Sequence, residues 1–262
     1  MAGRLRSTLM TALTAPKTVK ATRYVTPLRE GGSMPGLMEA DDDGLYVVKF
    51  RAAGQGTLAL AAELIAASIA ETLGIRMPPL VFVDVDPALG VAEPDPEIKE
   101  LIVGSPGVNL GSDFLPGATT YSPADERQPS GEEAAAIVWF DSLITNVDRS
   151  PRNPNLLVWH DELWAIDHGA ALYRQHAGLE GADPAGAFPQ IADHVLLAHA
   201  GSIIEAGARL APLVTRDALT AAVEVVPEQW FTGSPAAAYV DYLAARVDAS
   251  AEFSEEAERA RR

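Results

Sequence analysis

The chain has no cysteine among its 262 residues. Disulfide bonds, thiolate metal sites and cysteine nucleophiles are therefore excluded, and the absence is compatible with a cytoplasmic protein. Basic residues are also scarce, because 20 Lys and Arg stand against 36 Asp and Glu and the formal net charge is −16. Such a surface repels a phosphate backbone, so we expect no nucleic acid among the partners.

Long apolar runs are missing too. The segment from Met10 to Leu13 is too short for the core of a secretory signal, and no stretch reaches the length that a membrane span needs. Hydrophobic residues still make up 48% of the chain and charged residues 21%, which is ordinary for a globular protein with a buried core. We therefore expect a soluble, cytoplasmic protein without a membrane span.

The few basic residues are unevenly placed. Six of them lie in residues 1–30, beside a single acid, Glu30. This bias predicts a basic N-terminal arm, which we place at residues 1–22. Two roles stay open for the arm, because it is either a solvated terminus or a contact for an anionic partner.

The first part of the chain combines short β patterns with one helix. Residues 22–50 predict two or three short strands, of which Leu45–Phe50 is the last. The apolar pattern of residues 57–73 predicts a helix that ends at Gly74. Residues 80–85 are typical of a further strand.

The second part is mostly helical. Residues 86–131 are rich in Gly, Pro, Asp and Ser, which is the composition of a linker between lobes. After it we expect an apolar helix at 134–144, a β-hairpin at 156–166 and helices from about residue 190, the first of them at 191–199. A β-rich part followed by a helical part indicates an α+β protein in two lobes.

Two charged residues stand inside apolar patterns. Lys49 lies in a predicted strand, and Glu63 lies in a predicted helix with no basic residue within one turn of it. Glu63 therefore has no local helix partner, so it is either at a surface edge or paired with a distant cation. Lys49 is our candidate for that cation.

A second polar cluster lies between two predicted core elements. Residues 146–155 carry an acid, Asp148, two arginines and three asparagines, directly before the hairpin. A loop of this polarity between buried elements is typical of a site, although side chains bonded to their own backbone would also explain it. Asp167, at the end of the hairpin, is either a site residue or part of an Asx-turn.

Taken together, these residues follow the pattern of phosphoryl transfer. That reaction uses a strand Lys, a helix Glu, an Asp near the attacking hydroxyl, an amide oxygen on the metal and a final Asp at a strand end. The order Lys49, Glu63, Asp148, Asn153 and Asp167 meets this pattern, including the four-residue gap of the catalytic loop.

Three motifs resemble those of the HipA-like kinases and, more distantly, the phosphatidylinositol kinases. They are Val-Val-Lys-Phe at 47–50, Asn-Val-Asp-Arg at 146–149 and Ile-Asp-His-Gly at 166–169. The resemblance runs over about residues 25–175. It implies a two-lobed protein-kinase-like fold. Residues 23–120 would form a small β-rich N-lobe with one main helix, and residues 121–262 would form a mostly α-helical C-lobe. It also implies an ATP- and Mg²⁺-dependent kinase with a hydroxyl acceptor.

The resemblance also implies a role for each matching residue. Lys49 would bind the α- and β-phosphates and pair with Glu63, Asp148 would orient or deprotonate the hydroxyl, and Asn153 and Asp167 would hold Mg²⁺. A phosphate loop is expected at Gly31, Gly32 and Ser33, and the resemblance implies that its Ser is open to autophosphorylation. The hinge that contacts adenine is expected at Phe114 and Leu115.

The sequence departs from the family pattern at three places. Ser150 stands where these kinases usually have His, His168 follows the metal-binding Asp where an aromatic residue or an acid is more familiar, and Asn155 competes with Asn153 for the metal. These departures leave the acceptor and the rate open.

Three alternatives remain from the sequence. The first is an inactive nucleotide-binding pseudokinase, and the second is a small-molecule kinase. The third is a metal-dependent hydrolase that would use Asp148, Asp167 and His168. Arg149 and Arg152 are also open, because they either contact an acidic acceptor or anchor the loop.

Overall fold

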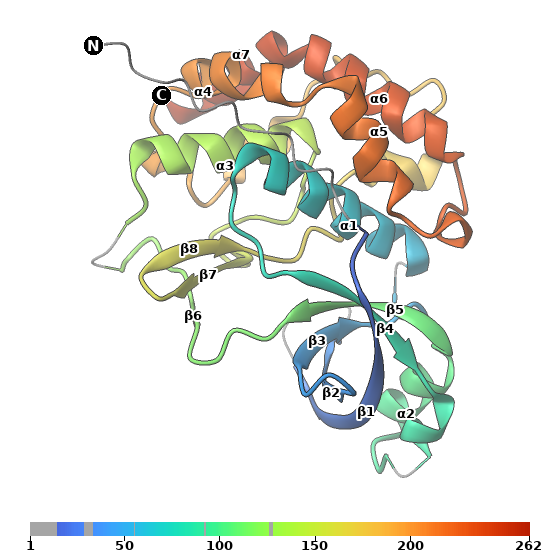
Figure 1. Ribbon diagram of the computed structural model, residues 1–262. Helices are drawn as coiled ribbons and strands as arrows, with labels where there is room; N and C mark the ends of the chain where they lie inside the picture. Colours follow the sequence, from blue (N-terminus) through green and yellow to red (C-terminus); the bar gives the residue numbers. More distant parts are fainter. Residues whose placement is uncertain (1–14, 29–33, 55, 92, 126–127) are drawn as a thin grey trace, which may run out of the picture.

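The computed structural model describes residues 15–28, 34–54, 56–91, 93–125 and 128–262 of the chain. Within them, a small β-barrel forms the first part and helices form most of the second part (Figure 1). The expected α+β organisation, with a β-rich part, one long helix and a mostly helical part, is confirmed.

The barrel closes in the strand order β1-β2-β3-β5-β4. Neighbouring strands are antiparallel except β1 and β4, which run parallel. Side chains from these strands share one apolar cluster, and closure leaves the barrel without a free edge. The strands are β1 Thr18–Pro27, β2 Gly36–Ala40, β3 Leu45–Lys49, β4 Leu80–Val85 and β5 Gly107–Asp113.

Strand β1 begins at Thr18, inside the range 1–22 that was expected to be a basic arm. Val19 is buried in the barrel cluster, whereas Lys20 on the opposite face is exposed. The alternation of apolar and polar residues therefore makes this stretch a strand with a basic outer face. Residues 1–14 lie outside the described part of the chain.

Residues 86–131 are not a linker, and this expectation from composition is wrong. They contain helix α2 (Pro96–Val103), strand β5 and the short strand β6 (Thr119–Thr120). Strand β5 pairs with β3 on one side and β4 on the other, which local composition does not reveal. A Cβ atom on Gly111 would lie 2.7 Å from Cγ2 of Val83, so the glycine that suggests a loop permits close strand packing.

Helix α1 spans Gly56–Leu73, which confirms the helix expected at 57–73. It is apolar on most sides and shares the larger core cluster with the helices of the second part. The division expected at residue 120 assigns α1 to the first lobe alone, but its packing joins the two parts. By length and composition α1 would also pass as a membrane span, contrary to the expectation that no stretch is long enough. A core helix passes the same test, and 56% of α1 is buried inside the protein.

The helical part packs around α3, which lies against α4 and α7 (Figure 1). Ser130 begins α3, because its hydroxyl accepts a hydrogen bond from the Glu133 N–H. The helices are α3 Gly131–Leu143, α4 Ile203–Leu210, α5 Arg216–Glu224, α6 Ala236–Asp248 and α7 Ser250–Arg261. Short 3₁₀ turns lie at Pro87–Gly90, Tyr173–Ala177, Pro189–Asp193, Leu197–His199, Ala211–Leu213 and Glu228–Trp230.

The expected hairpin is present, but the first helix expected after residue 190 is not. Strands β7 (Leu156–Trp159) and β8 (Glu162–Ala165) form the hairpin, and β6 adds a third strand. Residues 191–199 form parts of two 3₁₀ turns instead of one helix. Between these turns the Val195 N–H donates to the Arg149 carbonyl at 3.0 Å, so tertiary pairing replaces the helix.

Candidate active site

An ammonium and two carboxylates meet where the barrel faces the hairpin. Lys49 is the last residue of β3, Glu63 lies in α1, and Asp167 follows β8. Lys49 Nζ lies 2.6 Å from Glu63 Oε2 and 2.6 Å from Asp167 Oδ1. Of the two settings left open for Glu63, pairing with a distant cation is therefore correct, and the cation is Lys49.

Burial and charge act against each other in this cluster. Burial raises the pKa of Glu63, but the charge of Lys49 and the hydrogen bonds from Lys49 and His168 together hold the pKa well below its usual range. Burial likewise lowers the pKa of Lys49, but Glu63 and Asp167 together raise it above its usual value. The His168 backbone N–H donates to Glu63 Oε2 at 2.6 Å. Glu63 is thus a fixed anion that holds the Lys49 ammonium in place.

The loop at 146–155 arranges its amides around Asp148. Asn153 Nδ2 donates to Asp148 Oδ2 at 2.9 Å, and Asn155 Nδ2 donates to the Asp148 backbone oxygen at 2.6 Å. Both amide groups turn their nitrogen toward Asp148, which leaves both amide oxygens available to another partner. Asn153 and Asn155 line the same cavity, so the choice of metal ligand that spacing left open stays open.

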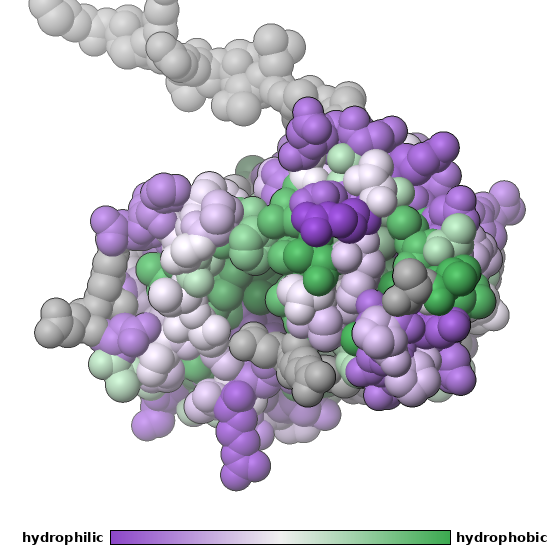
Figure 2. Space-filling model, turned by 90° about the horizontal axis from the view of Figure 1, so that it is seen from below, coloured by the Kyte–Doolittle hydropathy of each residue, from purple (hydrophilic) through white to green (hydrophobic). Residues whose placement is uncertain are grey.

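A cavity of about 320 Å³ joins these residues, and Lys49, Glu63, Asn153 and Asp167 line it. This volume is in the range of small-molecule sites. Asp148 is not among the lining residues and reaches the cavity through its amide neighbours. Apolar residues complete the lining; they include Val47, Met77, Leu80, Leu157 and Ile166. On the face seen from below, apolar side chains gather between hydrophilic margins (Figure 2).

The two expected hinge residues, Phe114 and Leu115, also line the cavity. Phe114 N–H donates to the Leu45 carbonyl at 2.9 Å, which fixes this segment against β3. The Leu115 N–H and the Phe114 carbonyl make no hydrogen bond within the described part of the chain. An N–H and a carbonyl on neighbouring residues are therefore free to bond a ligand.

The expected phosphate loop, Gly31, Gly32 and Ser33, lies outside the described residues. The described residues on either side of this loop lie at the cavity. Leu28 and Pro35 both line the cavity, and the Leu28 N–H donates to the Pro35 carbonyl at 2.8 Å. The described chain therefore lies at the cavity on both sides of this segment.

Arg149 is buried directly behind the loop and is only 2% exposed. Its Nε lies 2.5 Å from Asp141 Oδ2, and its Nη2 lies 2.6 Å from His168 Nε2. Nη1 donates to the backbone carbonyl of Asn155. Of the two roles that the sequence left open for Arg149, anchoring the loop is therefore correct and contact with an acceptor is wrong.

Asp141 is the centre of this buried network, and sequence reasoning missed it. Its carboxylate is fully buried and accepts hydrogen bonds from His194 Nε2 at 2.9 Å and Asn146 Nδ2 at 3.0 Å. Burial raises the pKa of Asp141, but the charge of Arg149 and the hydrogen bond from His194 act together and hold the pKa well below its usual range. The signal was present, because Asp141 is an acid inside an apolar helix just as Glu63 is.

His168 does not face the cavity. Its side chain is fully buried between Arg149 and Phe140, whose ring centroid lies 5.5 Å from that of the imidazole. Within the described residues, no three His, Asp or Glu side chains gather as a metal site. The metal-hydrolase alternative, which needs His168 beside Asp148 and Asp167, therefore does not fit.

The donors that line the cavity do fit a hard divalent cation that is shared with phosphate. The Asp167 carboxylate is 33% exposed and lines the cavity with the Asn153 amide. Mg²⁺ in kinases is held by one or two carboxylates together with substrate phosphates, not by a complete protein cage. One carboxylate and one amide oxygen are therefore a sufficient share from the protein.

A family model for HipA-like kinases matches residues 22–252. The chain belongs to the HipA-like kinase family. It is therefore a kinase-type enzyme, and the match extends well past the motifs at 146–149 and 166–169 that first indicated the family. No curated protein sequence matches the chain.

Solved structures show which fold this HipA-like kinase has. A proinflammatory kinase of Helicobacter pylori, CtkA, is similar over 94% of this chain and 98% of its own, with a TM-score of 0.56 and 12% identity. The Golgi casein kinase is similar over 94% of this chain and 72% of its own, with a TM-score of 0.52 and 16% identity. A structure of the Golgi casein kinase with Mn/ADP bound covers 91% of this chain and 73% of its own, with a TM-score of 0.50 and 15% identity. The expected kinase-like fold is confirmed.

Proposed function

We propose that this HipA-like kinase transfers the γ-phosphate of ATP to a hydroxyl group and uses Mg²⁺ to do so. One observation carries the proposal: Lys49 Nζ lies 2.6 Å from both Glu63 and Asp167, at the edge of a cavity of small-molecule size. Phosphoryl transfer depends mainly on positioning and on charge stabilisation, and these side chains supply both.

The protein residues have distinct tasks in this proposal. Lys49 neutralises the α- and β-phosphates, and Glu63 holds its ammonium in position. Asp148 accepts the proton of the acceptor hydroxyl while the acceptor oxygen bonds the γ-phosphorus and the bond to the β-phosphate oxygen breaks, releasing ADP. Asp167 and Asn153 would hold Mg²⁺, which supplies neutralisation of phosphate charge.

Adenine is assigned to the hinge side of the cavity. The free Leu115 N–H and Phe114 carbonyl provide one donor and one acceptor, which is the pair that the adenine edge requires. The apolar lining from Val47, Leu80 and Leu157 suits the faces of a purine ring.

Autophosphorylation at Ser33 is a further part of the proposal. It is supported by the family resemblance of the segment 31–33 and by the position of Leu28 and Pro35, which bring the chain to the cavity on both sides of that segment. The hydroxyl of Ser33 is then the acceptor, and the balance of bonds is the same as for any other alcohol.

The acceptor is best sought by a phosphotransfer screen of a cell lysate with labelled ATP. Wild-type protein is expected to label a protein or a small molecule, and Asp148→Ala is the control that should label nothing. Equal labelling by both forms would contradict the role of Asp148, and no labelling by the wild type, together with no hydrolysis of ATP, would favour the pseudokinase alternative.

A further inference from the structure

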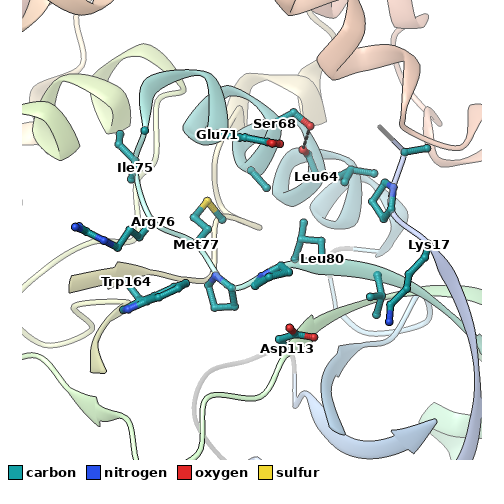
Figure 3. A pocket seen from close by; sticks show the side chains of 17 residues that line it. Lys17, Leu64, Ser68, Glu71, Ile75, Arg76, Met77, Leu80, Asp113 and Trp164 are labelled. Atoms are coloured by element: carbon teal, nitrogen blue, oxygen red, sulfur yellow. Dashed lines mark hydrogen bonds between the residues drawn. The ribbon is translucent and has the colours of Figure 1, made fainter. Parts of the chain in front are cut away.

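A second hollow lies behind the proposed nucleotide cavity. It is a groove of about 710 Å³ between α1, the connection 74–79 and residues 15–17, which directly precede β1. Figure 3 shows Glu71 on the α1 side, Leu80 on the opposite side, and Lys17 and Trp164 at the two ends. Among its lining residues, only Leu80 has a part in the proposed nucleotide contacts, and it lies in the wall that the two hollows share.

The free charges of the groove are negative. Glu71 has no side-chain hydrogen bond or ion pair in the described part of the chain, and no donor there bonds the Asp113 carboxylate. Burial raises the pKa of Asp113, although Lys17 opposes this. The two basic residues of the groove are already engaged, because Lys17 pairs with Asp42 and Arg76 pairs with Glu133 and Glu162.

The rest of the lining is largely apolar. Leu64 and Ala67 of α1 contribute from one side, and Ile75, Met77 and Leu80 contribute from the other. An occupant that combines apolar side chains with positive charge would therefore complement the groove.

Residues 1–14 of this chain have that chemistry and directly precede the groove residue Ala15 in the sequence. They contain Arg4 and Arg6 and no acid, together with Leu5, Leu9, Met10 and Leu13. Ala15, the first described residue, lines the groove. Nine Cα–Cα steps lead from Arg6 to Ala15 and can extend to about 30 Å, which exceeds the length of about 27 Å for an 18-residue helix such as α1.

We propose that residues 1–14 dock in the groove between α1 and the connection 74–79. In this arrangement their leucines contact the apolar lining, and Arg4 or Arg6 approaches Glu71 and Asp113. Burial of the leucines supplies most of the attraction, because exposed ion pairs contribute little. Met77 and Leu80 line both the groove and the proposed nucleotide cavity, so the docked segment contacts the back of a wall that the two share. The proposal does not rest on the phosphotransfer reaction.

The absence of cysteine makes a crosslinking test direct, because any disulfide must come from introduced residues. Full-length chains carrying Thr8→Cys or Thr11→Cys would each be combined with Ala67→Cys in the groove. The matched control combines the same substitutions with Ala208→Cys, which is exposed on α4 outside the groove. Disulfide formation under mild oxidation is followed by intact-mass spectrometry and peptide mapping.

Docking predicts that at least one pair with Ala67→Cys closes tenfold faster or more than its control with Ala208→Cys, within one chain and independently of protein concentration. Equal rates would overturn the proposal. A disulfide between two chains, rising with concentration, would also overturn it and would assign the groove to a second copy.

A second measurement changes no residue that lines the groove. Hydrogen exchange of residues 64–77 is compared between the wild type and a full-length variant with Arg4→Ser, Arg6→Ser, Leu9→Ser and Leu13→Ser. Docking predicts faster exchange in the variant, confined to the groove segments. Identical exchange in the two proteins would contradict docking whatever the crosslinking result.

Discussion

The buried pair of Arg149 and Asp141 allows the sharpest stability prediction. Both side chains are fully buried, and Arg149 Nε lies 2.5 Å from Asp141 Oδ2. We consider the substitution Asp141→Asn, which keeps the shape of the side chain and removes its charge. The guanidinium of Arg149 then stays buried without a counter-charge, beside the loop that carries Asp148.

The magnitude follows from this burial. Removal of one partner of a buried ion pair costs about 3–5 kcal/mol, against a total stability of about 5–15 kcal/mol for a typical domain. The combined variant Asp141→Leu with Arg149→Met leaves no unpaired charge, so it should cost far less than the sum of the two single changes. We expect a coupling energy of about 3 kcal/mol in this double-mutant cycle.

Urea unfolding of the wild type, Asp141→Asn, the single variants Asp141→Leu and Arg149→Met, and their combination measures these quantities. A loss of 3–5 kcal/mol should lower the unfolding midpoint by about 1 M or more. Arg152→Met is the matched control, because Arg152 is exposed three positions away and should change stability by less than about 0.5 kcal/mol. A cost below about 1 kcal/mol for Asp141→Asn, or additive effects in the cycle, would refute the anchoring role of Arg149.

Three further predictions concern the site, the pH dependence and the phosphate loop. Lys49→Met should lower kcat/KM about 100-fold or more, because loss of a phosphate-positioning cation costs on the order of 3 kcal/mol at the transition state. Unchanged kinetics would remove Lys49 from the site. Burial lowers the pKa of His194, and although Asp141 opposes this, the charge of Arg149 adds to the lowering. The unfolded chain therefore binds more protons than the folded chain below about pH 6.5. The free energy of unfolding of the wild type should fall as the pH drops, with a slope of up to about 1.4 kcal/mol per pH unit. Urea unfolding at several pH values should show a shallower fall for a His194→Gln variant. Incubation with MgATP should add one phosphate at Ser33, and intact-mass spectra without it, or peptide maps placing it elsewhere, would dismiss that acceptor.

The residues of the cavity could be predicted because each breaks a local pattern. Lys49 and Glu63 are charges inside apolar elements, and burial in such positions requires a partner. The spacing of Asp148 and Asn153 and the position of Asp167 after a strand then fixed the order of the motif. Burial, geometry and the sequence pattern agree on these residues, although their individual roles in catalysis stay predictions.

The sequence does not reveal features that depend on distant pairing. Strand β5 is rich in Gly, Asn and Ser, and it is ordered only because β3 and β4 bond it on both sides. The segment 191–199 has an apolar pattern typical of a helix, yet Val195 and His194 bond to Arg149 and Asp141 instead. Tertiary hydrogen bonds overrode local propensity in both cases.

The central claim is that Lys49, Glu63 and Asp167 lie around one bound nucleoside triphosphate. Its most direct test is the Mg²⁺-dependent loss of the ATP γ-phosphate, measured for purified wild-type protein and for Asp167→Ala. We predict turnover by the wild type that falls at least about 100-fold in the variant, because the metal loses its protein carboxylate. Equal turnover by the two proteins would contradict the account.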